Sequence, residues 1–261
     1  VIDLRYENPL YLAEDAGAAD LISGGRLQLG ISRGSPEQVV DGYRYFGYEP
    51  AEGSDHAEMA RQHAAVFLEV IQGKGFAEPN PRPMFPNPPG LLPIEPHSPG
   101  LRDRIWWGAG TRATAEWTAA QGMNLMSSTL LTEDTGVPFH QLQAEQIQMF
   151  RDAWKAAGHE REPRVSVSRS IFPIVSDTDR AYFGHESRSQ DQVGYLDGGT
   201  ARFGMSYADE PDKLVTALAE DVAVAAADTL LLTVPNQLGV AYNAHVIESV
   251  VKLVAPGLGW R

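Results

Sequence analysis

Two stretches of the sequence combine residue types that could bind an anion. In the first, GISRG at residues 30–34, an arginine and a glycine end a strand-like run. In the second, GAGTRAT at residues 108–114, a glycine-rich turn leads into an expected helix. Backbone N–H groups at a helix N-terminus are unpaired and carry partial positive charge, so this turn could hold a phosphate. Gly108 and Gly110 would let a ligand approach the backbone, and Thr111 and Thr114 would both face the first turn of the helix.

Each stretch also has other interpretations. Arg33 could lie in a solvated turn, and Thr111 could simply cap its helix. GAGTRA also fits the dinucleotide fingerprint G-x-G-x-x-A, with Glu133 or Asp134 roughly twenty residues on as the acid that binds a ribose. This NAD interpretation ranks last, because the motif lies in the middle of the chain after other βα units.

The sequence excludes several other chemistries. It has no cysteine, so thiolate nucleophiles, disulfides and cysteine-ligated metals are absent. Its histidines do not combine at metal-ligand spacing, and no metal site is expected. The net charge of −13 argues against nucleic acid and against an anionic membrane surface as partners. We find no apolar run near 18 residues and no signal-peptide pattern, and therefore expect a cytoplasmic protein.

Strand-like and helix-like segments alternate along the chain. Strands are expected at 1–6, 26–32, 104–107, 123–128, 164–175 and 228–234, and helices at 8–23, 55–73, 111–122, 138–158, 211–227 and 243–256. Alternation of this kind predicts a parallel sheet, in a (β/α) barrel or in an open doubly wound fold. We expect one domain over residues 1–261, with a proline-rich excursion at about 74–103 and an irregular polar segment at about 177–210.

The stretch NPLYLAEDAGAADLISGGRLQLGISRG, at residues 8–34, resembles the bacterial-luciferase-like flavin-dependent monooxygenases. The resemblance continues through RIWWGAGTRATAEWTAAQG and through AADTLLLTVPNQLGVAYNAH, and so covers nearly the whole chain. It implies a (β/α)8 TIM barrel that binds FMN at the carboxyl ends of its strands, where the active sites of such barrels lie.

The resemblance also assigns roles to residues. It implies that Arg33 is the strand-end arginine that reaches the flavin phosphate, and that Arg61 is a second phosphate-binding arginine. Thr111 and Thr114 match the hydroxyl groups at the phosphate helix, and Ser32 matches a small side chain beside the flavin ring. GISRG and GAGTRAT would then form the two halves of one phosphate site.

The resemblance further implies that two βα units precede the equivalent of Val1, so that the barrel is incomplete at its N-terminus. The family's active-site histidine would lie in that part, and we therefore assign no catalytic residue. The strand at 1–6 is expected to pair with the strand at 26–32 on one side only.

We expect a monooxygenase that uses reduced FMN and O2 to oxidise a small organic substrate, with the reduced FMN supplied by a separate flavin reductase. One alternative is a hydride-transfer oxidoreductase that uses the deazaflavin F420, and another is a flavin-binding protein without turnover. The helix at 8–22 has apolar residues on more than one face, and related proteins pair through this region. We therefore expect a homodimer.

Overall fold

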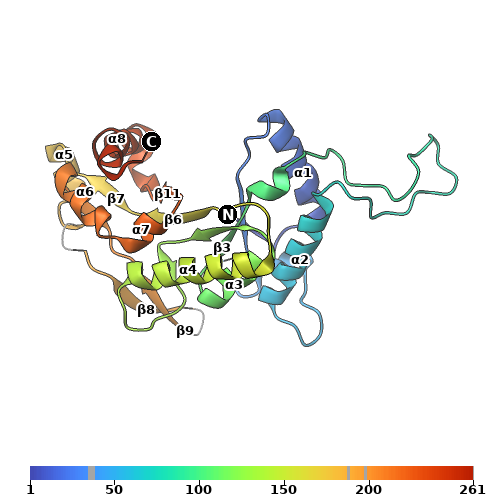
Figure 1. Cartoon of the computed structure of the whole chain (residues 1–261), viewed down its shortest axis with the longest axis horizontal. Helices are drawn as coiled ribbons and strands as arrows, with labels where there is room; N and C mark the ends of the chain where they lie inside the picture. Colours follow the sequence, from blue (N-terminus) through green and yellow to red (C-terminus); the bar gives the residue numbers. More distant parts are fainter. Residues whose placement is uncertain (35–38, 187–188, 197–198, 261) are drawn as a thin grey trace. The chain divides into compact units, whose positions relative to one another are not determined.

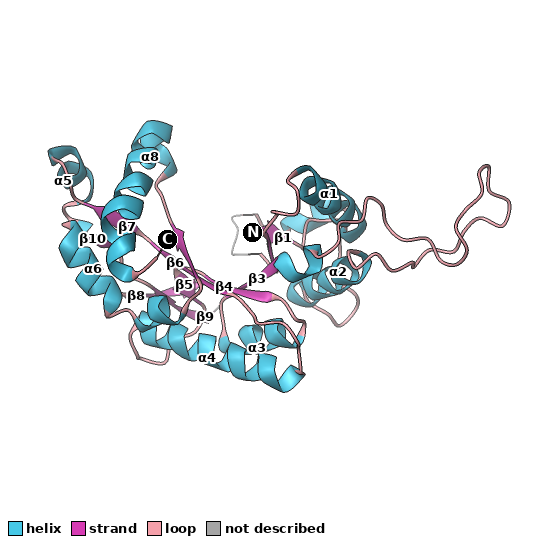
Figure 2. Cartoon of the chain, turned by 45° about the horizontal axis from the view of Figure 1, so that its top comes forward, coloured by secondary structure: helices cyan, strands magenta, loops and turns pink. Residues whose placement is uncertain are grey.

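The computed structural model describes residues 1–34, 39–186, 189–196 and 199–260. The chain divides into two compact units. The first comprises Val1–Gly108 and Gly122–Asn124, and the second comprises Ala109–Gln121 and Leu125–Arg261. Figures 1 and 2 show the helices and strands of both units.

The first unit contains three parallel strands in the order β1 (Ile2–Asp3), β2 (Leu29–Ser32) and β3 (Ile105–Ala109), the last of which ends in the second unit. In register, Ile2 lies opposite Ile31, and Leu29 lies opposite Ile105. Within the described residues, β1 pairs with β2 alone, as expected. Fully buried apolar side chains of these strands and of the turn after β1 form the core of this unit.

The helices of the first unit begin where the sequence predicts. Asn8 caps α1 (Pro9–Ile22), because its side-chain oxygen accepts hydrogen bonds from the backbone N–H groups of Leu10 and Tyr11. Asp55 caps α2 (His56–Val70) in the same way. The described part of this unit also contains two 3-10 turns, η1 (Gly42–Phe46) and η2 (Leu101–Arg104).

The buried carboxylate of Asp20 ties α1 to the rest of the first unit. It accepts hydrogen bonds from the Ser98 hydroxyl at 2.7 Å, from Arg104 at 2.5 Å and from the backbone N–H of Leu27 at 3.0 Å. Burial raises the pKa of this carboxyl, but these bonds outweigh it, and the pKa lies below its ordinary value. A buried charge with this many partners fixes α1 in one position.

The proline-rich excursion is confirmed. Between α2 and η2 the chain runs out from the body of the first unit and returns, as Figure 1 shows. Its base is joined by an antiparallel bridge between Ala77 and Leu92. Towards its tip, Met84 and Phe85 are among the most exposed apolar side chains of the described chain. We call residues 78–91 the excursion tip.

The second unit contains a parallel set of strands in the order β4 (Asn124–Ser127), β6 (Val165–Arg169) and β11 (Thr229–Leu232). The first residue of β4 belongs to the first unit. The strand expected at 164–175 is divided in two, because the chain leaves the set after Arg169. Its second part, β7 (Ile171–Pro173), pairs instead with β10 (Tyr207–Asp209) in parallel. The observed order of strands and helices confirms the expected α/β class with a parallel sheet.

Helices α3 (Arg112–Ala120) and α4 (Phe139–Ala157) pack against one another in the second unit, as Figures 1 and 2 show. The helix expected at 211–227 is two helices, α6 (Pro211–Ala219) and α7 (Val222–Ala226). The break arises because Asp221 turns its carboxylate onto the backbone N–H groups of Ala223 and Val224 and caps α7.

The segment at 177–210 is not irregular, which corrects the sequence-based expectation. Its described part begins with α5 (Asp177–Phe183), capped by Ser176, and continues with strands β8 (Gln192–Leu196) and β9 (Gly199–Phe203). These two strands are antiparallel, and β9 also pairs with β5 (Leu130–Leu131). Most side chains of β8 and β9 are exposed or half-buried, so the hairpin lacks the hydrophobic alternation that would predict it.

The chain ends in a helical stretch made of η4 (Asn236–Leu238), α8 (Gly239–Ser249), the π-helical η5 (Val250–Val254) and η6 (Ala255–Leu258). By length and composition, residues Asn236–Leu258 could cross a membrane, and 22% of their most apolar window is buried. This differs from our expectation of no such stretch. A single helix of this kind is weak evidence of a membrane span. Val246 of this stretch packs instead with Phe172 and Phe183 in a core cluster of the second unit.

Candidate functional site

The GAGTRAT turn joins the end of β3 to the start of α3. Thr111 is the N-cap of α3, and its hydroxyl oxygen accepts a hydrogen bond from the backbone N–H of Thr114 at 3.1 Å. The same hydroxyl donates to the Thr114 hydroxyl oxygen at 2.8 Å. Both hydroxyl groups therefore lie at the first turn of α3, as their spacing predicts. The capping role of Thr111 is thus real, and it is compatible with a role in binding.

The first turn of α3 fits an anion. Among the described residues, the backbone N–H of Ala113 has no hydrogen-bond partner. This free donor lies beside the two threonine hydroxyls and at the positive end of the helix dipole. A phosphate oxygen could accept from such a group without displacing any hydrogen bond of the protein.

One acidic side chain already uses part of this helix end. Glu133 accepts a hydrogen bond from the backbone N–H of Arg112 at 3.3 Å and from its guanidinium Nε at 3.1 Å. Asp134 accepts from Arg202 at 2.8 Å. Because both acids have partners in the second unit, the NAD interpretation loses its two candidates for a ribose-binding acid.

A buried glutamine on α4 donates hydrogen bonds to the backbone of the GAGTRAT turn. The Nε2 of Gln146 donates to the backbone carbonyl oxygens of Ala109 at 3.2 Å and of Thr111 at 3.1 Å. Its Oε1 accepts from the Ser127 hydroxyl at 2.6 Å, and Gln143 donates to that hydroxyl at 2.8 Å. Gln146 is thus a positioning residue for the turn.

Sequence reasoning missed Gln146, although a signal was present. Gln143 and Gln146 lie on the face of the helix that also carries Leu142, Ile147 and Phe150, and both glutamines are fully buried. Amide side chains on an apolar face must find hydrogen-bond partners inside the protein. Their position therefore indicated a polar network beneath α4.

The two glycines of the turn have packing roles that the sequence did not indicate. A Cβ atom on Gly110 would lie 3.1 Å from the hydroxyl oxygen of Thr132, whose backbone N–H donates to the Gly110 carbonyl at 2.8 Å. A Cβ on Gly108 would lie 3.3 Å from the Cβ of Ser32. Close neighbours, and not only ligand access, thus favour glycine at both positions.

In the first unit, Ser32 and Arg33 follow one another at the carboxyl end of β2. Ser32 is buried, and its hydroxyl oxygen accepts a hydrogen bond from the backbone N–H of Gly34 at 3.0 Å. Gly34 has φ of +84°, and a Cβ there would collide with Arg5 and Asp3. Glycine is therefore required after Arg33, which itself is half-exposed.

Arg33 and Arg61 both lie close to acids at the start of α2. The backbone N–H of Glu58 lowers the pKa of the Asp55 carboxyl, and the charge of Arg33 lowers it further. The Nη1 of Arg61 lies 3.7 Å from the carboxylate of Glu58. Asp55, Glu58 and Arg61 line an open depression of about 500 Å³. A phosphate here would compete with these carboxylates for the arginines.

The predicted site residues thus divide between the two units. Ser32, Arg33, Arg61 and Gly108 belong to the first unit, and Gly110, Thr111 and Thr114 belong to the second. In the first unit Gly108 lies against Ser32, and in the second Gly110, Thr111 and Thr114 lie at the start of α3. Their joint contact with one phosphate stays a prediction.

A family model described as luciferase-like monooxygenase matches residues 2–186. The chain belongs to the luciferase-like monooxygenase family. The match confirms the resemblance that the sequence shows to this family. It begins at residue 2, and so does not support our expectation of two βα units before Val1.

Solved structures resemble the chain over almost its whole length. Monooxygenase RslO1 from Streptomyces bottropensis is 16% identical, with a TM-score of 0.67, and the match covers 99% of this chain and 77% of that one. The oxygenating constituent of 3,6-diketocamphane monooxygenase from Pseudomonas putida, in complex with FMN, is 15% identical, with a TM-score of 0.64 and coverage of 97% and 77%.

A third similar structure is the coenzyme F420-dependent tetrahydromethanopterin reductase from Methanopyrus kandleri. It is 14% identical, with a TM-score of 0.59, and the match covers 98% of this chain and 81% of that one. At such low identity these likenesses establish the fold, which is that of the luciferase-like α/β structures. A search of curated proteins finds no match.

Proposed function

We propose that the protein is a flavin-dependent monooxygenase that uses reduced FMN and O2 to oxidise a small organic substrate. The observation that carries the proposal is the first turn of α3, where a free backbone N–H lies beside the hydroxyls of Thr111 and Thr114. Family membership and the FMN complex of the Pseudomonas putida relative support FMN as the ligand. Bound flavin would supply the redox chemistry, for which this chain has no cysteine of its own.

The residues of the chain would bind and orient the flavin. Thr111 and Thr114 would contact the phosphate together with the Ala113 N–H, and Arg33 and Arg61 would neutralise its charge. Ser32, as a small side chain at the end of β2, would lie beside the flavin ring. Ligand binding at the carboxyl ends of the strands agrees with the general placement of active sites in folds of this kind.

The second candidate is hydride transfer with F420. The Methanopyrus kandleri relative, which has the same fold, depends on that coenzyme. An anion site at a helix N-terminus does not distinguish between the two cofactors, whereas their absorption spectra do. Purified protein should be titrated with each cofactor, and tighter binding of F420 than of FMN would favour this candidate. A flavin-binding protein without turnover would bind FMN but consume no O2 with any substrate.

A separate flavin reductase is the partner that this proposal requires. Glu133 and Asp134, which a dinucleotide site would need for a ribose, are bound to Arg112 and Arg202. A monooxygenase that does not reduce its flavin itself would receive that flavin in the reduced form from such a reductase. We also propose a homodimer, since Tyr11 and Ile22 expose apolar side chains on α1.

The test compares FMN with riboflavin, which lacks the phosphate. A charge-assisted hydrogen bond contributes roughly 1.5–3 kcal/mol, so Arg33→Ala should weaken FMN binding by about ten-fold to a hundred-fold. Thr111→Val should weaken it less, because a neutral hydroxyl is lost. Riboflavin affinity should change little in either variant.

The control is Arg180→Ala, which removes an exposed arginine from α5. It should leave the affinity for both flavins unchanged. Equal FMN affinity in the wild-type protein and in Arg33→Ala would show that Arg33 does not bind the phosphate.

A further inference from the structure

A second cavity lies wholly within the second unit. It has a volume of about 440 Å³ and is bounded by the start of α4, the segments that flank the β8–β9 hairpin, and the end of α6. Known sites for small molecules have volumes of roughly 300–1,000 Å³. None of the residues assigned above to the phosphate lines it.

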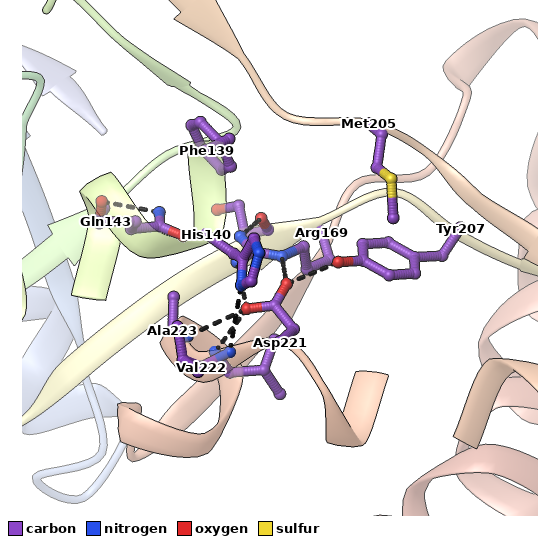
Figure 3. Close-up of polar contacts among 12 residues, drawn as sticks. Phe139, His140, Gln143, Arg169, Met205, Tyr207, Asp221, Val222 and Ala223 are labelled. Carbon is purple, nitrogen blue, oxygen red and sulfur yellow. Dashed lines mark hydrogen bonds and ion pairs between the residues drawn. The ribbon is translucent and has the colours of Figure 1, made fainter. Parts of the chain in front are cut away.

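The floor of the cavity is a buried ion pair, which Figure 3 shows. The guanidinium of Arg169 donates from Nε to one carboxylate oxygen of Asp221 at 2.7 Å and from Nη2 to the other at 2.9 Å. The Tyr207 hydroxyl donates to Asp221 at 2.7 Å. Asp221 also caps α7, so its acceptor capacity is filled and its charge is balanced by Arg169. The floor is therefore rigid and close to neutral.

The walls of the cavity are apolar and aromatic. Phe139, Met205 and Tyr207 line it, and Figure 3 shows them around the ion pair. The guanidinium carbon of Arg169 lies 5.4 Å from the centre of the Phe139 ring. This ring already contacts one cation, in the geometry in which an aromatic face attracts positive charge. The walls thus suit a compact apolar group.

The polar lining carries an excess of negative charge. Asp191 accepts hydrogen bonds from the backbone N–H groups of Phe139 at 2.7 Å and of Met205 at 3.2 Å, which fix its carboxylate at the start of α4. Glu220 is exposed at the end of α6. In the described chain, neither acid forms an ion pair with a lysine or arginine. Arg169 is already paired with Asp221, so the charges of Asp191 and Glu220 are not balanced by a cation of the described lining.

The remaining polar group of the lining is a histidine. His140 receives a hydrogen bond at Nδ1 from the backbone N–H of Val222, at 3.4 Å. This hydrogen bond joins the start of α4 to the start of α7 at one edge of the cavity.

We propose that this cavity binds a small organic cation, an ammonium group carried on an aromatic or aliphatic body. The ammonium would lie near Asp191 and Glu220, and the body would pack on Phe139, Met205 and Tyr207. Carboxylate or phosphate ligands would be repelled by the same acids. The site is distinct from the proposed phosphate site in its residues and in the charge that it selects.

The test is isothermal titration calorimetry of the full chain with three probes of similar shape. These are phenethylamine, which is a cation at neutral pH, the neutral 2-phenylethanol, and the anion 3-phenylpropanoate. We expect phenethylamine to bind about ten-fold more tightly than the alcohol, and the anion to bind least. Added salt should weaken the binding of phenethylamine selectively.

Two variants locate the binding site. Glu220→Gln, at an exposed position, should weaken phenethylamine binding by about three-fold to ten-fold. Met205→Trp should weaken it by about ten-fold or more, because the larger side chain occupies the space beside Phe139. Glu116→Gln, which makes the same change at an exposed acid on α3, is the matched control and should have no effect. All three variants should bind FMN as the wild-type protein does, so a failure of the flavin proposal would be seen separately.

Three results would each overturn the proposal. They are the absence of phenethylamine binding to the wild-type protein, equal affinity for all three probes, and unchanged binding in a Met205→Trp variant whose circular dichroism shows a native fold.

Discussion

Replacement of Gln146 by leucine tests how the GAGTRAT turn is held. The side chain is fully buried and makes hydrogen bonds to Ala109, Thr111 and Ser127 at 3.2, 3.1 and 2.6 Å. Leucine has a similar size but can make none of these bonds. The Ala109 carbonyl oxygen would then lie against an apolar group, whereas the Thr111 carbonyl would keep its hydrogen bond from the Ala115 N–H at 3.1 Å. Ser127 would keep its bond from Gln143 but lose the acceptor of its own hydroxyl proton.

The expected loss of stability follows from this inventory. A buried polar group left without a partner costs roughly 1–3 kcal/mol. Two groups lose a partner: the Ala109 carbonyl loses the Gln146 donor, and the Ser127 hydroxyl loses the Gln146 oxygen as acceptor. Some of the cost is recovered when the turn shifts or water enters. We therefore expect Gln146→Leu to lower the free energy of unfolding by about 2–4 kcal/mol.

Gln148→Leu is the matched control, because Gln148 is on the same helix but exposed, and it donates to Asp152 on the same helix. An exposed change of this kind should alter the free energy of unfolding by less than about 0.5 kcal/mol. Urea unfolding followed by far-UV circular dichroism gives both values. Hydrogen exchange should in addition show faster exchange of the Thr114 amide in Gln146→Leu.

The same variant connects the turn to the proposed flavin site. If the turn binds the phosphate, its displacement should weaken FMN binding about five-fold or more and leave riboflavin binding nearly unchanged, because sites lose affinity when their supporting residues are removed. Equal unfolding midpoints for Gln146→Leu and Gln148→Leu would refute the structural reasoning. An unchanged preference for FMN over riboflavin in a destabilised Gln146→Leu would refute the functional link.

Three further predictions concern other parts of the chain. Gly17→Ala should lower the melting temperature, because the added Cβ would lie 2.2 Å from the carbonyl oxygen of Pro96, and overpacking costs roughly 1–3 kcal/mol. Burial raises the pKa of the Asp221 carboxyl, but its hydrogen bonds and its ion pair with Arg169 outweigh this effect, and the pKa lies below the ordinary value of 3.8. The ionised carboxylate therefore stabilises the fold fully above pH 3.8, and this stabilisation is lost as the pH falls through the lowered pKa. Urea unfolding across this pH range should show a smaller loss of unfolding free energy for Asp221→Asn than for the wild-type protein. A homodimer through α1 should dissociate when Tyr11 and Ile22 are both replaced by glutamate, and light scattering that gives the dimer mass for this variant would contradict that interface.

Local signals in the sequence predicted much of the fold. Thr111 located the cap of α3, because a cap depends on residues within one turn of the chain. The alternation of strands and helices predicted the parallel α/β class, because each segment shows its own hydrophobic pattern in the sequence. The residue ranges were less accurate where a helix or strand is interrupted. Asp221 ends one helix and caps the next, and a hydrophobic pattern that continues across it conceals the break.

Long-range hydrogen bonds were the part of the site that could not be predicted. Gln146 reaches carbonyl groups 35 and 37 residues earlier in the chain, and Arg169 meets an acid 52 residues later. No periodicity or short motif specifies such partners, since they depend on how α4, β6 and α7 pack. The sequence indicated that buried polar groups needed partners, and the structure identifies which ones they are.

The excursion tip has a consequence for how this chain can change in length. Three backbone hydrogen bonds among Phe76, Ala77 and Leu92 close its base, at 3.0, 3.2 and 2.8 Å. These bonds do not involve residues of the tip. Residues inserted near Met84 or Phe85 would therefore be connected to the fold only through the hydrogen-bonded base. The added closure entropy of a longer loop grows slowly, by roughly 0.6 kcal/mol for each doubling. The tip is therefore a position where a whole reporter domain can be inserted, or where a protease can cut, with the rest of the first unit left folded.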